Sequence, residues 1–120
     1  MQDKPAWRVS FLQLVDPFGW HAIGSEKAVE VRTKLGHFES MTWHQILTEG
    51  GGHNHPIPVG DLCKTARDRL EDLRLEDIDE LVSLRLGGAE RVWGIRDGNV
   101  MLLLWWDPEH AVCPSLKKHT

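Results

Sequence analysis

An unbroken run of apolar residues at positions 100–106 constrains the fold of this chain more than any other feature. A strand with one solvated face alternates apolar and polar residues, whereas this run has no polar face, so it predicts a central strand covered on both sides. Asp97 and Gly98 stand just before it, and this dipeptide favours a two-residue hairpin because a type I′ turn needs positive φ at both positions. Residues 91–96 are then its antiparallel partner.

Weaker patterns place the other elements around this hairpin. Alternation predicts strands, and apolar residues three or four apart predict helices. The predicted strands are residues 7–15, 82–86, 91–96 and 100–106, with an edge strand at 111–113. The predicted helices are residues 26–35 after Ser25, a short helix from the capping box of Thr42 and Gln45 to the stop at Gly50, Gly51 and Gly52, and residues 61–74 with Asp61 as N-cap.

This order predicts an α+β fold. An N-terminal strand precedes two or three helices and a three- to four-stranded antiparallel sheet, with the helices on one face. The 120 residues fit one domain of the usual size, about 100–150 residues, and no linker or repeat divides residues 1–120. With 41% hydrophobic and 27% charged residues the chain is not of the disordered class, and two cysteines are too few for a disulfide scaffold.

Cysteine use, hydropathy and charge limit the compartment and the partners. The two cysteines fit a reducing cytoplasm, no apolar run approaches the ~18 residues of a membrane span, and the N-terminus lacks the apolar core of a signal peptide. We therefore expect a cytoplasmic protein without a membrane partner. A net charge of −4 argues against nucleic-acid binding through the charge of the whole chain. It does not argue against nucleic-acid binding at a local basic site.

Three arginines on adjacent predicted strands are candidates for binding a phosphate. Arg85, Arg91 and Arg96 each offer planar, bidentate donors. Strand alternation puts Arg91 and Arg96 on opposite faces, so at most one of them joins Arg85. The alternative is that all three are solvated and paired with nearby acids such as Glu90 and Asp97.

Histidines supply the candidates for proton transfer and for metal binding. His110 follows the buried strand, where an imidazole is suited to act as general acid or base; the alternative is a turn histidine paired with Asp107. His53 and His55 would point the same way in an extended loop, and with Asp107, His110 or Cys113 they would complete a metal site. A solvated loop is the simpler interpretation. We expect no cofactor and no zinc bound by His53, His55 and His110 together.

The C-terminal tail carries further basic residues, Lys117, Lys118 and His119. They either fray as a chain terminus or reach the same pole of the molecule as the arginines. Several enzyme classes are excluded, because the chain has no Walker A motif, no dinucleotide-binding glycine motif, no nucleophile elbow and no zincin motif.

Residues 84–104, LRLGGAERVWGIRDGNVMLLL, resemble the RelE/ParE/HigB-like toxin superfamily. Its small members carry a strand with a leucine and a glycine, a strand that begins with arginine, and then a long apolar strand. The order of one strand, helices and antiparallel strands is also similar. The chain departs from the family's pattern in having no tyrosine and an acidic net charge.

The resemblance implies a toxin of a toxin–antitoxin system: a metal-independent endoribonuclease that cleaves mRNA, often on the ribosome, and is held by an antitoxin protein. In this family basic residues on the sheet grip the phosphate, and a terminal histidine, tyrosine or lysine assists proton transfer. The residues that the resemblance assigns to catalysis are His110, Arg91, Arg85, Lys117 and His119. Those it assigns to substrate binding are Arg96 and Lys118.

Two other function classes stay open. One is a non-catalytic protein-interaction module, whose signature would be Trp20, Trp43 and Trp93 in one exposed patch far from Arg85 and His110. The other is a metal-dependent hydrolase that uses the His53–His55 loop and His110.

Overall fold

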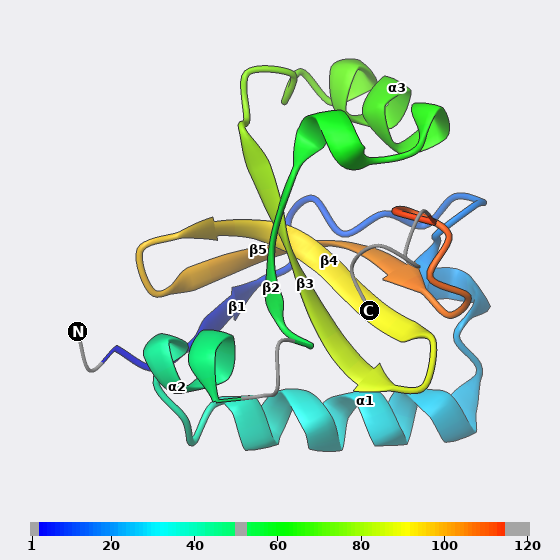
Figure 1. Ribbon diagram of the computed structural model, residues 1–120. Coiled ribbons are helices and arrows are strands. Elements are labelled where there is room, and N and C mark those ends of the chain that lie inside the picture. Colours follow the sequence, from blue (N-terminus) through cyan, green and yellow to red (C-terminus); the bar gives the residue numbers. More distant parts are fainter. Residues whose placement is uncertain (1–2, 50–52, 115–120) are drawn as a thin grey trace.

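A mixed sheet forms the middle of the fold (Figure 1), which the computed structural model describes over residues 3–49 and 53–114. Its five strands lie in the order β1 (Ala6–Arg8), β5 (Val100–Asp107), β4 (Glu90–Asp97), β3 (Glu80–Gly87) and β2 (His55–Pro58). The helices are α1 (Ser25–Phe38), α2 (Trp43–Thr48) and α3 (Lys64–Asp72), with 3-10 turns at Trp20–Ala22 and Val59–Asp61. The predicted α+β class is confirmed.

The hairpin predicted from the apolar run is also confirmed. β4 and β5 pair antiparallel as predicted, but Asp97 still pairs with Val100, so the two loop residues are Gly98 and Asn99. Only Gly98 has a positive φ, of 64°, so the turn lies one residue later than predicted and is not of type I′. β5 lies between β1 and β4 and is therefore interior to the sheet. The capping box of Thr42 and Gln45 forms as predicted, with both reciprocal hydrogen bonds present.

The N-terminal strand is shorter than predicted and parallel to its neighbour. Only Ala6–Arg8 pairs with β5, and this pairing ends at Leu102. Beyond it β5 bulges, because Trp93 pairs with Trp105 whereas Gly94 pairs with Leu103. The chain after β1 therefore leaves the ladder and covers the rest of the β5 edge as a loop.

Two further boundaries differ from the prediction. α3 begins at Lys64 with Cys63 as its N-cap, so Asp61 is not the cap; it lies in a 3-10 turn before the helix. Residues 111–113 form no edge strand, because the amides of Ala111 and Val112 bind the Asp107 side chain and not a neighbouring strand. The glycines at 50–52 lie outside the described residues.

The helices cover both faces of the sheet, which corrects the prediction of one covered face. α3 packs on the face that carries Leu81, Trp93 and Trp105. α1 and α2 pack on the opposite face, which carries Val82 and Trp106. Figure 1 shows α3 on one side of the strands and α1 and α2 on the other. A strand without a polar face needs this arrangement, since both of its sides are then buried.

Candidate functional site

Two arginines face each other on adjacent strands. Arg85 of β3 is the register partner of Arg91 of β4, and both side chains are half-buried. Burial lowers the pKa of Arg91 and the charge of Arg85 lowers it further, while Asp107 opposes the shift. Within residues 3–49 and 53–114 neither arginine forms an ion pair. Arg91 is instead anchored through its Nη1, which donates to the carbonyls of Gly88 (2.7 Å) and Glu90 (3.1 Å).

His110 lies in the turn after β5, on the same face of the sheet as Arg91. Its ring meets Trp93 edge-on, with the ring centroids 6.4 Å apart, and Trp93 lies two residues beyond Arg91 on β4. The residue has a φ of 57°, a left-handed conformation that is uncommon outside glycine but in which asparagine, aspartate and histidine are enriched. The turn therefore fixes the position of the His110 ring beside Trp93.

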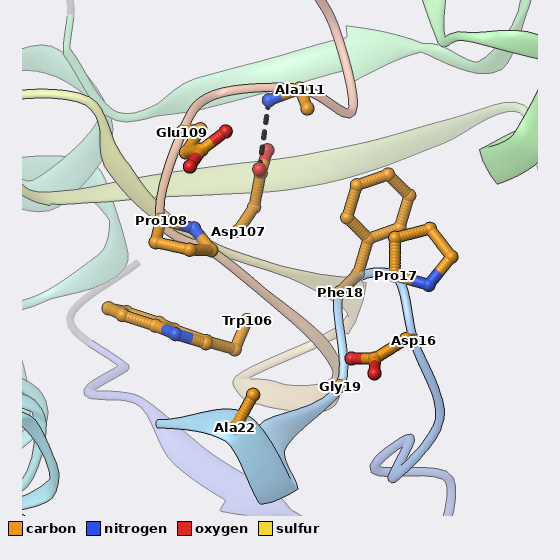
Figure 2. Close-up of a pocket in the computed structure, with 10 residues that line it drawn as sticks. All are labelled: Asp16, Pro17, Phe18, Gly19, Ala22, Trp106, Asp107, Pro108, Glu109 and Ala111. Carbon is orange, nitrogen blue, oxygen red and sulfur yellow. Dashed lines mark hydrogen bonds between the residues drawn. The ribbon is translucent and has the colours of Figure 1, made fainter. Parts of the chain in front are cut away.

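The Asp107 carboxylate builds this turn. The residue is 1% exposed and accepts three hydrogen bonds: from Trp93 Nε1 at 3.0 Å, from the Ala111 amide at 2.8 Å and from the Val112 amide at 3.0 Å. Figure 2 shows the bond to Ala111 closing the turn. Asp107 is thus committed to structure, which explains why it forms no salt bridge with His110 as the alternative interpretation of that histidine proposed.

The surroundings of His110 favour a neutral ring. Burial lowers its pKa below the ordinary value of 6.5, and the positive charge of Arg91 lowers it further; His55 adds to the shift and Asp107 opposes it. Its Nδ1 is buried without a hydrogen-bond partner among the described residues. Any proton exchange with a ligand therefore goes through Nε2, from a ring that is unprotonated near neutral pH.

Sequence reasoning grouped His55 with His110 only as possible metal ligands and did not include it in the arginine site. His55 of β2 is the register partner of Ser83, and Ser83 pairs with Trp93. One cross-strand row is therefore His55, Ser83, Trp93 and Trp105, and the next row on the same face is Arg85, Arg91 and Asp107. The histidine pair at 53 and 55 was visible in the sequence, but its position depends on pairing between β2 and β3, which no local pattern gives.

Of the other predicted site residues, Arg96 is described by the structure and lies apart from the paired arginines, His110 and His55. Arg96 is exposed on the opposite face, with its Cζ 5.0 Å from the ring centroid of Trp43, so the prediction that Arg91 and Arg96 face opposite ways is confirmed. Lys117, Lys118 and His119 lie outside the described residues. We call the group of Arg85, Arg91, His110 and His55 the cationic cluster.

The signatures of the alternative functions are weak. Trp43 and Trp93 are buried in cores on opposite faces and share no exposed patch with Trp20. Within the described ranges no three His, Cys, Asp or Glu side chains group as metal ligands. Burial raises the pKa of the Cys113 thiol, whose Sγ donates to the carbonyl of Asp61 at 3.4 Å, so this cysteine is not an activated nucleophile.

A cavity of about 310 Å³ adjoins the turn that carries His110 (Figure 2). The rings of Phe18 and Trp106 line it, together with the carboxyl-bearing Asp16 and Glu109, and His110 is not among the lining residues. Acidic groups repel phosphate. An anionic ligand is therefore expected at the cationic cluster and not in this cavity.

The depressed pKa of His110 makes folding stability depend on pH. At about pH 8 the residue is neutral in both states; as the pH falls through 6.5 the unfolded chain gains a proton that the folded chain resists, so stability falls until the pH passes the lower, folded pKa. We expect urea unfolding to show a smaller loss between about pH 8 and pH 5 for His110→Asn, which tolerates the positive φ. Equal losses in variant and wild type would contradict the shift.

Among the described residues no helix is long and apolar enough to span a bilayer. Comparison with known proteins gives no match to a family model, to a curated protein or to a solved structure. The resemblance to the RelE/ParE/HigB-like toxins therefore stays a prediction, and the site is interpreted from its own geometry.

Proposed function

We propose that this protein is a toxin-like, metal-independent endoribonuclease that cleaves RNA through the 2′-hydroxyl of the substrate. The observation that carries the proposal is the cationic cluster, in which two register-paired arginines lie beside a histidine with a lowered pKa. No described carboxylate lies within ion-pair distance of either arginine, and Asp107, the register partner of Arg91 on β5, is taken up by its own three hydrogen bonds. Such a cluster is unusual on a chain of net charge −4, and it is suited to one phosphodiester. Action on mRNA in the cytoplasm and restraint by an antitoxin protein belong to the same proposal.

The chemistry needs a base, an anion clamp and an acid. His110 Nε2 takes the proton of the 2′-hydroxyl, and the resulting oxygen attacks the adjacent phosphorus. Arg85 and Arg91 stabilise the negative charge of the pentavalent phosphorane. The bond to the 5′ oxygen then breaks, and an acid protonates this leaving group, so a 2′,3′-cyclic phosphate and a 5′-hydroxyl result. As that acid we propose His55, whose charge acts on His110. Lys117 and His119, to which the resemblance assigns a catalytic role, are the other candidates.

The test is cleavage of RNA by the purified protein in the presence of EDTA. We expect products with 2′,3′-cyclic phosphate and 5′-hydroxyl ends, and a loss of about 10²–10⁴ in kcat for His110→Asn. Arg91→Gln should lose about 10²–10³. The present proposal gives Arg96 no part in substrate binding, contrary to what the resemblance implies, because Arg96 lies over Trp43 on the opposite face. Arg96→Gln makes the same change on the same strand and is therefore expected to cleave as the wild type does.

Growth gives an independent measurement. Expression of the wild type should arrest cells, and His110→Asn and Arg91→Gln should relieve the arrest while thermal unfolding of both variants stays cooperative. Intact RNA with the wild type, or full activity in both variants, would replace this proposal by the interaction-module interpretation.

A further inference from the structure

A second basic hollow lies at the end of β3, beside the cationic cluster. Its volume is about 280 Å³, and it is formed where α1, the segment before β2 and the end of β3 meet. The residues that line it are Lys34, Phe38, His53, Asn54, Arg85, Leu86 and Gly87. The ionisable side chains among them are all basic, and Arg85 belongs both to this hollow and to the cationic cluster.

The charges around this hollow are not neutralised by neighbouring acids. In the described part of the chain no carboxylate lies within ion-pair distance of Lys34, His53 or Arg85. Lys27, two turns earlier on α1, shows the contrast: its Nζ lies 2.8 Å from Glu30 and 2.7 Å from Glu90, which raise its pKa to about 12. The positive charges of Lys34 and Arg85, with no acid paired to them among the described residues, favour an anion in this hollow.

Asn54 fixes the geometry of the hollow. The residue is 8% exposed, its Oδ1 accepts from the amide of Arg85 at 2.8 Å, and its Nδ2 donates to the carbonyl of Ile46 at 3.4 Å. These bonds tie the segment before β2 to the end of β3 and to α2. His53 is therefore held at the hollow by a buried neighbour, although its own side chain is exposed.

We propose that this hollow is a second phosphate subsite, which binds a phosphodiester of the same RNA next to the one that is cleaved. The inference rests on the proposed function and adds Lys34 and His53 as substrate-binding residues. Arg85 lies between the two positions, so a single strand that passes from the cationic cluster to the hollow keeps its backbone against basic groups throughout. The second subsite also gives the segment that contains His53 a role in substrate binding that needs no metal ion.

The double variant Lys34→Gln/His53→Gln, which removes the Lys34 charge and the His53 imidazole, tests the subsite. For a hexanucleotide we expect KM to rise about tenfold with kcat within about twofold, and for a dinucleotide, which has one phosphate, no change in either constant. The slope of log Kd against log salt concentration, measured with single-stranded RNA, should fall by about 0.7 to 1.4, because one or two phosphate contacts are lost. Arg32→Gln is the matched control, because Arg32 is exposed on α1 and does not line the hollow.

Binding of a fluorescent 2′-O-methyl hexanucleotide separates this inference from the proposed function, because that ligand cannot be cleaved by the 2′ route. Weaker binding by the double variant than by Arg32→Gln supports the subsite even if the wild type cleaves no RNA. Equal binding by both variants overturns it. The last experiment titrates inorganic phosphate and follows the NMR amide signals of Asn54 and Arg85. If phosphate saturates the hollow but does not compete with the hexanucleotide, the hollow is a site for free phosphate and the RNA subsite is overturned.

Discussion

Replacing Asp107 by alanine is expected to lower the free energy of unfolding by about 3–5 kcal/mol, because the carboxylate is the shared acceptor of buried donors. Its three hydrogen bonds come from the Trp93 indole and from the amides of Ala111 and Val112. The Asp107 side chain is 1% exposed, and its bonds from Trp93 and Val112 are buried, so water does not replace these two. Chemical denaturation of the purified variant measures the loss.

Asp107→Asn keeps the size of the side chain and one of its two acceptor oxygens. We expect it to lose less stability than Asp107→Ala, about 1–3 kcal/mol, because at least one donor is left without an acceptor. Both variants should also shift the ring signals of His110 in NMR spectra and lower RNA cleavage, since the turn that holds His110 is built on this carboxylate. A loss below about 1 kcal/mol for Asp107→Ala would show that the turn does not depend on these bonds.

Features of the fold that are encoded locally could be predicted from the sequence. Asp97 and Gly98 indicate a tight turn between neighbouring strands, although the loop itself consists of Gly98 and Asn99. The apolar run after the turn has no polar face to expose to water. The capping box works in the same way, because its hydrogen bonds join Thr42 and Gln45 within one helical turn. Such elements are determined by residues close together in the sequence, so they can be predicted without knowing how the rest of the chain folds.

Features that depend on distant pairing could not be predicted. Alternation at residues 7–15 is compatible with a long strand, but β1 ends at Arg8 because its partner β5 bulges two residues after the last pair. The apolar stripe of α3 does not say which face of the sheet it covers. The same limit applies to the site: Arg85 and Arg91 were found as a pair of candidates, whereas His55 joins them through the β2–β3 register.

Gly94→Ala is expected to destabilise the fold by about 2–3 kcal/mol, near the upper end of the usual cost of overpacking. An added Cβ would lie 2.8 Å from Met101 Cε and would also collide with the backbone of Leu102. The Met101 side chain can move, but the strand backbone cannot without breaking the β4–β5 ladder. The glycine is therefore required by the close approach of the two strands at the bulge and not by a positive φ, in contrast to Gly98.

Gly36→Ala is the matched control, because Gly36 lies within α1 and an added Cβ there meets nothing within 4 Å. This substitution should stabilise the protein by about 0.5–1 kcal/mol, since alanine loses less conformational entropy than glycine on forming a helix. Urea denaturation of the two variants should therefore give changes of opposite sign. If Gly94→Ala costs less than about 0.5 kcal/mol, the strands do not approach closely at the bulge, and the register that aligns Trp93 with Trp105 and Arg91 with Asp107 is wrong.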